Sequence, residues 1–369
     1  MTCPNCHESH HAPGALFCHI CGQALGLSTP QTEISSTHNL EWADNFSEGL
    51  AMVVTGGKTG FLDRKGNFII PPTFNQEGSY IFGHDSQMGF SEGLAAVSNG
   101  HYPYRQYGCI DPSGAWVIPP KYTCIWHFSE GLAPFLQKDK WGYLDKAGHI
   151  VIPPIYQQAG FFSDGLAVVQ TAYDKYAFID RTGQTVIKKS SNLFHKVGFN
   201  HACAFHDGLA RVECNGRKGF INRAGSFSPV RYAELEDFSE GMAGFKISKP
   251  GKDARCGFLN TNLSIAIEPK FDSVSPFHEG LAVVRTNGQS GYVNTSGDLV
   301  IPCQFDSAAP FSEGMAAVTI GNKIGFVNAS GVLVIVPTFE SARRFSEGIA
   351  AVKENGKWHY IEKTGKRVF

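Results

Sequence analysis

Short apolar runs alternate with glycine-rich turns along almost the whole chain, and no segment keeps an apolar period of 3.6 residues. One run reads Leu-Ala-x-Val and ends at a Gly/Asn turn. A second reads Gly-aromatic-aliphatic-Asp/Asn, and a third, Val-Ile, is followed by Pro-Pro. Because proline cannot donate to a strand ladder, we expect the third strand to end there. The pattern predicts three short strands per unit and very little helix.

The motif Phe-Ser-Glu-Gly-Leu-Ala marks each unit and recurs, with small variations, at a base period of about 34 residues. Its nine phenylalanines are Phe46, Phe90, Phe128, Phe162, Phe205, Phe238, Phe277, Phe311 and Phe345. Longer intervals indicate inserted loops, where we expect specificity to lie because loops vary without disturbing stacked units. The insertions are Asn75–Gly89, Asn99–Tyr107, Leu193–Ala204 and Ser248–Arg255.

The second run of each unit ends in Asp-x-x-Gly, which predicts a type I turn followed by a left-handed glycine. We expect the acid to accept hydrogen bonds from the amides of this turn. The sixth copy has Leu263 in place of the glycine, and Asn262 beside it is our candidate for the left-handed residue.

The assembled unit resembles the WG repeat family, whose Trp-Gly pair is kept here at Trp141-Gly142. The resemblance covers residues 40–369, although copies four to six drift from the pattern. It implies a bacterial interaction module for which the family supplies no single ligand. We therefore take residues 40–369 as one WG β-repeat array.

A unit of this size cannot bury its apolar face alone, so neighbouring units must stack. The fold class we expect is all-β, with nine tandem three-stranded units in a propeller-like ring, or alternatively an open β-solenoid. Leu40 lies six residues before Phe46, as Phe339 lies six before Phe345. The chain stops at Val368-Phe369, so the two ends are complementary fragments of a unit. This favours the ring, although truncation of an open array would produce the same ends.

Four cysteines lie in the first 22 residues as two C-x2-C pairs separated by 11 residues. This spacing predicts one structural Zn²⁺ held by Cys3, Cys6, Cys18 and Cys21. The segment, residues 1–22, resembles short N-terminal zinc ribbons of the C-P-x-C … F-C-x-x-C-G type. The alternative is a pair of redox dithiols or two disulfides. Residues 23–39 are polar and without periodicity, which predicts a flexible linker.

Charge argues against nucleic acid as a partner. The net charge is −1, and residues 1–39 contain no Lys or Arg. Without cations the ribbon cannot release counterions from phosphate. No apolar run reaches the length of a membrane-spanning helix. Six scattered cysteines in the array, together with a zinc tetrathiolate, suit a reducing cytoplasm.

An acid stands in every copy of F-S-E-G. Stacking would bring these carboxylates into a row that could bind a cation or a basic partner. The interpretation we favour is that each accepts amides of its own tight turn. The nine residues are Glu48, Glu92, Glu130, Asp164, Asp207, Glu240, Glu279, Glu313 and Glu347. We expect adjacent units to pair them with basic residues two positions before the second-motif glycine: Lys58, Lys140, Lys175, Arg217, Arg255, Lys323 and Lys357.

Catalytic motifs are absent from the sequence, and the histidines of the array do not repeat in phase. His195, His201, Cys203 and His206 lie close together in the sequence, so a metal site or a Cys/His nucleophile is conceivable there. An irregular insertion explains them more simply.

We therefore expect a non-enzymatic binding or scaffold protein with a protein partner; a small-molecule ligand stays open. One alternative is an enzyme with its site in the central channel or the inserted loops. The other is nucleic-acid binding through the zinc ribbon.

Overall fold

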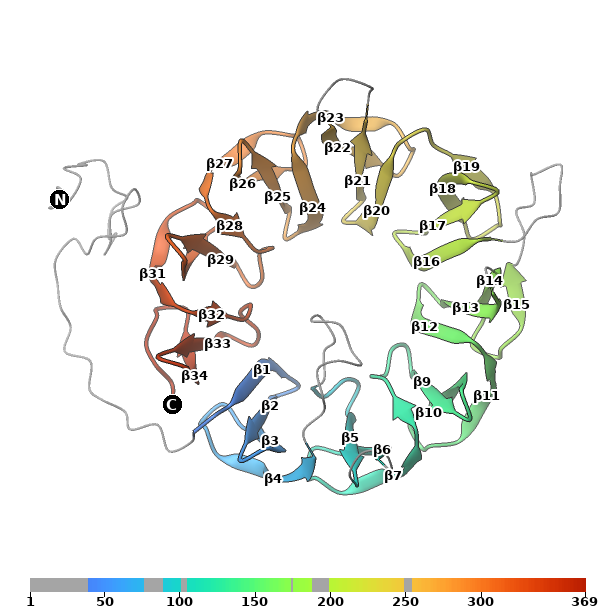
Figure 1. The fold of residues 1–369 in the computed structure, drawn as a ribbon, viewed down its shortest axis with the longest axis vertical. Helices are drawn as coiled ribbons and strands as arrows, with labels where there is room; N and C mark the ends of the chain where they lie inside the picture. The colour runs from blue at the N-terminus through green and yellow to red at the C-terminus, as the bar shows by residue number, and fades with distance from the viewer. Residues whose placement is uncertain (1–38, 76–88, 101–104, 174, 188–198, 249–253) are drawn as a thin grey trace, which may run out of the picture. The chain divides into compact units, whose positions relative to one another are not determined.

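The computed structural model describes residues 39–75, 89–100, 105–173, 175–187, 199–248 and 254–369. Every regular element in these ranges is a β-strand, and they contain no helix suited to crossing a membrane. The predicted zinc ribbon, residues 1–22, and all but the last residue of the predicted linker lie outside the described residues. The strands form nine antiparallel sheets, here called blades one to nine in chain order, and each blade is built from consecutive strands (Figure 1).

The chain divides into two compact units. The first unit comprises the described residues up to Thr73 together with Phe271–Phe369, and holds blades one, seven, eight and nine. Its strands are, in blade one, β1 (Trp42–Ser47), β2 (Leu50–Thr55), β3 (Lys58–Leu62) and β4 (Phe68–Asn75); in blade seven, β24 (Ser273–His278), β25 (Leu281–Thr286), β26 (Gln289–Asn294) and β27 (Leu299–Phe305); in blade eight, β28 (Ser307–Ala308), β29 (Met315–Ile320), β30 (Lys323–Asn328) and β31 (Leu333–Phe339); in blade nine, β32 (Ser341–Ala342), β33 (Ile349–Glu354) and β34 (Lys357–Glu362).

The second unit, Phe74–Lys270, holds blades two to six. Its strands are, in blade two, β5 (Ala95–Asn99), β6 (Gln106–Ile110) and β7 (Trp116–Tyr122); in blade three, β8 (Cys124–Ile125), β9 (Leu132–Gln137), β10 (Lys140–Asp145) and β11 (Ile150–Tyr156); in blade four, β12 (Gln158–Ser163), β13 (Leu166–Ala172), β14 (Lys175–Ile179) and β15 (Thr185–Ile187); in blade five, β16 (His201–His206), β17 (Leu209–Cys214), β18 (Arg217–Asn222) and β19 (Phe227–Pro229); in blade six, β20 (Glu234–Ser239), β21 (Met242–Ile247), β22 (Arg255–Asn260) and β23 (Ile265–Phe271).

The prediction of three strands per unit was wrong for seven blades, which have four. The extra strand precedes F-S-E-G, and the motif itself is the hairpin turn that joins the first strand to the second. In this turn the acid and the glycine both have positive φ, as in Glu130 (51°) and Gly131 (82°). Two such residues form a type I′ turn, whose twist matches that of the flanking strands.

The fourth strand does not end at Pro-Pro as predicted. In blade three, β11 continues through Pro153 and Pro154 to Tyr156, which pairs with Trp141 of β10. This is the edge strand of the sheet, and its register with β10 shifts across the prolines. An edge strand at an irregularity needs no amide from these residues, so proline is tolerated.

The same crossing explains the glycine after the tryptophan position. A Cβ on Gly142 would lie 2.5 Å from the carbonyl oxygen of Ile152 in the fourth strand. Equivalent backbone collisions occur at Gly60, Gly108, Gly219, Gly257, Gly291 and Gly325. Blades four and nine have Ala177 and His359 there, and neither has a Pro-Pro strand beside it in the described residues.

The Asp-x-x-Gly turns are as predicted. In blade three the amides of Ala147 and His149 donate to Oδ1 of Asp145, at 3.0 and 2.8 Å, and Gly148 has a φ of 82°. In blade six, however, Leu263 itself is left-handed, with a φ of 60°, so the assignment to Asn262 was wrong. The position in the turn, and not the residue type, decides which residue takes the strained conformation.

Each interface between neighbouring blades within a unit is an apolar layer around the phenylalanine of F-S-E-G. Phe162 is 1% exposed and meets the ring of Tyr143 from the preceding blade edge-on, with centroids 5.0 Å apart. Phe345 meets Phe326 in the same way at 4.9 Å. The aromatic residues of the repeat therefore form the core between blades.

Blades one and nine, at opposite ends of the sequence, are neighbours within the first unit (Figure 1). Leu40 forms a β-bridge with Trp358 of β34. The equivalent pair in blade eight is Phe339 with Ile324. The ring of Phe369, from blade nine, packs on Gly66 of blade one. In the same way Ile335, from blade eight, packs on Gly365 of blade nine. The two chain ends thus supply parts of a fourth strand for blade nine. An open solenoid would leave its end blades apart, so the arrangement is propeller-like.

Candidate interaction surface

Seven of the nine acids of F-S-E-G link one blade to the next. The carboxylate of Glu130 accepts a hydrogen bond from the amide of Gly165 in the next blade, at 3.0 Å. The same link to the following blade is made by Glu92, Asp164, Asp207, Glu279, Glu313 and Glu347. The remaining two, Glu48 and Glu240, also take part in interactions. The favoured role, accepting backbone amides, holds for these seven acids, but the amide belongs to the neighbouring turn. The acid is itself a central residue of the hairpin turn, and its side chain extends away from that turn to the next blade.

Three further contacts accompany this link. The Ser129 hydroxyl donates to the carbonyl of Phe162 in the next blade at 2.7 Å, and Ser346 does the same to Phe46. The Tyr143 hydroxyl donates to the carbonyl of Gly160 at 2.8 Å. Burial raises the pKa of Tyr143 well above its ordinary value, so its hydroxyl stays protonated as a donor.

Cations of the Asp-x-x-Gly turn pair with the acid of the preceding blade. Lys146 Nζ lies 3.2 Å from Glu92 Oε2, and Lys363 Nζ lies 3.3 Å from Glu313 Oε2. Although burial opposes it, the amide of Gly348 and the ammonium of Lys363 hold the pKa of Glu313 below its ordinary value. We had assigned this pairing to a different basic position, two residues before the second-motif glycine.

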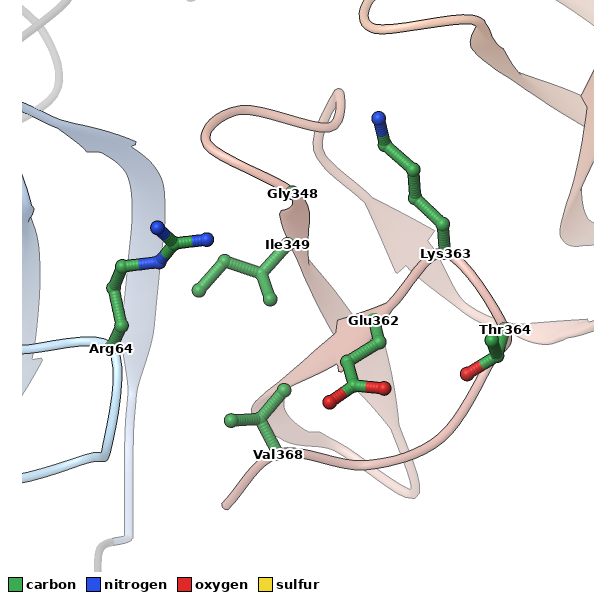
Figure 2. A pocket seen from close by; sticks show the side chains of 7 residues that line it. All are labelled: Arg64, Gly348, Ile349, Glu362, Lys363, Thr364 and Val368. Atoms are coloured by element: carbon green, nitrogen blue, oxygen red, sulfur yellow. The ribbon is translucent and has the colours of Figure 1, made fainter.

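A cavity of about 420 Å³ lies between blades nine and one in the first unit. Figure 2 shows Arg64 on one side of it, facing Gly348 and Ile349. The Arg64 guanidinium donates to the carbonyl of Glu347, and Lys363 is paired with Glu313. Since its cations are already used to join blades, we regard the cavity as a packing gap. Its full lining is Arg64, Gly348, Ile349, Glu362, Lys363, Thr364 and Val368.

Non-repeating chemistry is concentrated in the two residues before each F-S-E-G, which we call the bulge pair. The ladder between the first and second strands shifts register here, for instance between Ala159 and Phe162. A bulge adds a residue and redirects side chains. All eight fully described pairs differ: Asp44-Asn45, Trp126-His127, Gly160-Phe161, Cys203-Ala204, Glu236-Asp237, Ser275-Pro276, Ala309-Pro310 and Arg343-Arg344.

The pairs of blades three and four form an aromatic cluster in the second unit. Trp126 lies between Trp141 and Phe161 with its ring tilted to both, and the ring centroids are 4.9 and 5.2 Å apart. His127 lies parallel to Phe161 at 3.9 Å. All four rings are half-buried. Burial outweighs the nearby Glu92 charge and lowers the pKa of His127, so this imidazole is neutral at pH 7.

The pairs of blades five and six form a polar cluster in the same unit. Arg211 of β17 donates to Asp237 Oδ1 from Nε at 2.9 Å and to Cys203 Sγ at 3.1 Å. Glu236, beside Asp237, is exposed. The surface of the second unit therefore changes from aromatic to acidic along consecutive first strands.

The histidine cluster proposed from the sequence is described only in part. His201 Nδ1 lies 3.9 Å from Cys203 Sγ, His206 is exposed at the other end of β16, and His195 lies outside the described residues. Burial and the charge of Asp237 raise the pKa of Cys203 to about 11, so it is a thiol and not a nucleophilic thiolate. The described ranges contain no group of three His, Cys, Asp or Glu placed to hold a metal ion. Cys3, Cys6, Cys18 and Cys21 lie outside them.

In the first unit the corresponding position of blade nine carries a cation. The guanidinium carbon of Arg343 lies 4.2 Å from the ring centroid of Trp42 and 5.7 Å from that of Trp358. Trp358 occupies in blade nine the place of Trp141 in blade three. A guanidinium between indoles at this position is a cation–π contact.

The bulge pairs belong to no repeated motif, so recurring residues in the sequence do not reveal them. Aligning the nine copies on the phenylalanine would have revealed them, since the two preceding positions differ in each copy while the motif after them is kept.

The family model described as WG containing repeat matches more than half of the chain, at residues 32–58, 60–78, 107–141, 141–176, 257–289, 291–323 and 324–358. No curated protein sequence matches the chain. Among solved structures, a eukaryotic initiation factor is 11% identical, with a TM-score of 0.57 over 83% of this chain and 89% of that one. BamB from Moraxella catarrhalis is 10% identical, with a TM-score of 0.41 over 79% and 94% of the two chains. At such identity the first likeness shows the fold alone.

Proposed function

Because the chain belongs to the WG containing repeat family, we propose that its array is a non-enzymatic platform that binds a protein partner. One observation carries this proposal: the turns that join blades keep one motif, whereas every fully described bulge pair is different. Residues that only hold a blade together would recur with the blade. A surface on which each blade presents different chemistry suits recognition of an irregular partner.

The inserted segments support the same proposal. In an antiparallel four-stranded blade, the first-to-second and third-to-fourth turns lie at one end of the strands, and the other connections lie at the opposite end. The insertions predicted from the sequence add residues between β4 and β5, β5 and β6, β15 and β16, and β21 and β22, and none of them interrupts an F-S-E-G turn. Extra sequence is therefore placed where it leaves the F-S-E-G links intact.

Affinity capture from the native organism tests the platform. The full chain is compared with a variant carrying Trp126→Ala, Phe161→Ala and Glu236→Gln, and with a full-length Cys3→Ser/Cys6→Ser variant. We expect a protein that the wild type and the cysteine variant retain and the bulge-pair variant loses. Retention of the same proteins by all three would refute recognition through the bulge pairs of blades three, four and six.

The enzyme alternative requires a reactive group in a cleft. The raised pKa of Cys203 and the engaged cations of the cavity beside Arg64 support the non-enzymatic interpretation. If the purified chain turned over a substrate and Cys203→Ser abolished that turnover, the non-enzymatic interpretation would be wrong.

We also propose that Cys3, Cys6, Cys18 and Cys21 bind one structural zinc ion. The support is their spacing in two C-x2-C pairs, which suits a tetrahedral tetrathiolate site. Elemental analysis should find one zinc per chain in the wild type and none in the Cys3→Ser/Cys6→Ser variant. A wild-type protein without zinc would contradict the site.

A cytoplasmic location is part of the same proposal. The array cysteines described by the structure, Cys109, Cys124, Cys203, Cys214, Cys256 and Cys303, are free thiols, which suits a reducing compartment. Nucleic-acid binding through the ribbon predicts retention of DNA or RNA at low salt. We expect no mobility shift in that assay, because residues 1–39 carry no Lys or Arg.

A further inference from the structure

The second unit presents aromatic bulge pairs on blades three and four and an acidic bulge pair on blade six, with blade five between them. The first strands β12, β16 and β20 contact one another in order, and β12 also contacts β9 of blade three. We call the side chains of Trp126, His127, Phe161 and Glu236 the aromatic–acidic surface. On the premise that the array is a protein-binding platform, we propose that this surface binds an extended, arginine-containing segment of the partner protein.

The charges on and around the surface favour a cationic segment. Asp237 is neutralised by Arg211, and Glu234 by Lys246 at 3.0 Å. Glu236 is exposed between them. The imidazole of His127 is neutral, so it does not repel a cation. An approaching guanidinium therefore meets a carboxylate and the faces of aromatic rings.

The protein itself shows which cation fits beside these rings. In blade nine the position of Trp126 is taken by Arg343, whose guanidinium carbon lies 5.7 Å from the ring centroid of Trp358, the counterpart of Trp141. In blade three the position holds a tryptophan, so the guanidinium has to come from outside. Arginine is preferred to lysine at such a site because its planar group stacks on indole and pairs with carboxylate.

The proposal needs an extended segment, because the rings and the acid lie on different blades. The aromatic rings lie on blades three and four and the acid on blade six, so one side chain cannot reach both. An extended chain rises about 3.3 Å per residue, so about nine residues cover about 30 Å. Arginines on one face of such a segment could stack near Trp126 and pair with Glu236.

The probe is a fluorescein-labelled peptide of three Gly-Arg-Leu repeats, titrated with the full chain by fluorescence anisotropy. We expect saturable binding that weakens with added salt. Trp126→Ala should lower the affinity about tenfold, and Glu236→Gln about threefold. Trp126→Phe, which keeps a ring, should retain most of the affinity and shows that the loss is not misfolding.

Matched controls lie elsewhere on the second unit. Trp116 is an exposed tryptophan of β7 and Glu268 an exposed glutamate of β23. Trp116→Ala and Glu268→Gln should leave the affinity unchanged. A peptide with lysine in place of arginine should bind more weakly, and one with glutamate should not bind.

The proposal is overturned if the arginine peptide fails to bind, if the control variants weaken it as much as Trp126→Ala, or if the glutamate peptide binds equally well. If the chain captures its partner and Trp126→Ala/Glu236→Gln captures it equally, the arginine site is refuted while the platform stands. Loss of capture by a variant carrying changes at the other bulge pairs then locates the interface on those blades.

Discussion

In blade three a glycine, Gly142, follows Trp141 on the third strand, whereas in blade nine His359 follows Trp358. The two blades share the F-S-E-G turn, the buried tyrosine and the Asp/Glu-x-x-Gly turn. They differ in the fourth strand, which β11 provides in blade three and which Leu40 and Phe369 provide only in part in blade nine.

The difference shows what the glycine is for. In blade three a Cβ at this position would lie within 2.8 Å of the backbone at Pro153 and Pro154. Among the residues that the structure describes, no such strand crosses His359, which is 5% exposed and fills the space with its imidazole. Burial and the charge of Arg367 lower the pKa of His359 to about 4, so it packs as a neutral ring. The glycine is therefore required by close approach of the fourth strand.

The largest effect is expected from exchanging these residues. Gly142→His forces the fourth strand of blade three away and should lower the free energy of unfolding by about 3 kcal/mol or more. His359→Gly loses the packing of the imidazole and adds conformational freedom to the unfolded backbone, so it should lower the free energy of unfolding by about 1 kcal/mol. Urea denaturation of both variants measures the contrast. Equal losses would show that the crossing strand is not the reason for the glycine.

The link that blade nine receives from blade eight should depend on pH. The pKa of Glu313 lies below its ordinary value of 4.5. Its stabilisation is therefore fully present above that ordinary value and is lost as the pH falls through the lowered pKa. Glu313→Gln should cost about 1 kcal/mol at pH 7, and the difference from wild type should shrink below about pH 4. Glu268→Gln, an exposed control, should show no difference, and a constant difference down to pH 3 would contradict the carboxylate link.

A hydroxyl joins both blades to their successors. Tyr143 donates to the carbonyl of Gly160, and Tyr360 to that of Asp44, each at 2.8 Å. Tyr143→Phe and Tyr360→Phe should each cost about 1 kcal/mol, since a buried acceptor loses its donor. Thermal unfolding of the two variants should give similar losses. A much smaller loss for Tyr360→Phe would mean that blade nine packs more loosely on blade one.

The smallest effect on stability is expected where the blades differ in the bulge pair. Trp126→Arg gives blade three the residue of blade nine, and its guanidinium can stack on Trp141 as Arg343 does on Trp358. We expect a change of about 0.5 kcal/mol or less in unfolding free energy. The same variant should abolish binding of the arginine peptide, because the guanidinium of the new arginine then occupies the site. Unchanged peptide binding would show that Trp126 is not part of the peptide-binding site.

The sequence predicted those features that every copy repeats at short range. The positions of Phe162 and Asp145 and the fit of Leu40 to the last blade needed only the period. The first strand was missed because its residues differ from copy to copy and its bulge breaks the alternation of buried and exposed positions. The partner of Glu130 was misassigned because Gly165 lies 35 residues away, and local spacing carries no sign of a contact between blades.

The repeat pattern did not predict the residues of the candidate surface. Trp141 was visible as the family residue, but Trp126, Phe161 and Glu236 belong to no repeated motif. The contact between Trp126 and Phe161 depends on the stacking of blades, which brings residues of different copies together.

In the seven links described above, the F-S-E-G acid of one blade accepts the glycine amide of the same motif in the next blade. Each contact is therefore heterologous, and any blade can follow any other. A duplicated or deleted copy would present the serine, acid and glycine that its new neighbours require. The number of blades can thus change by whole units during evolution, while point substitutions in the bulge pairs alter what the protein recognises.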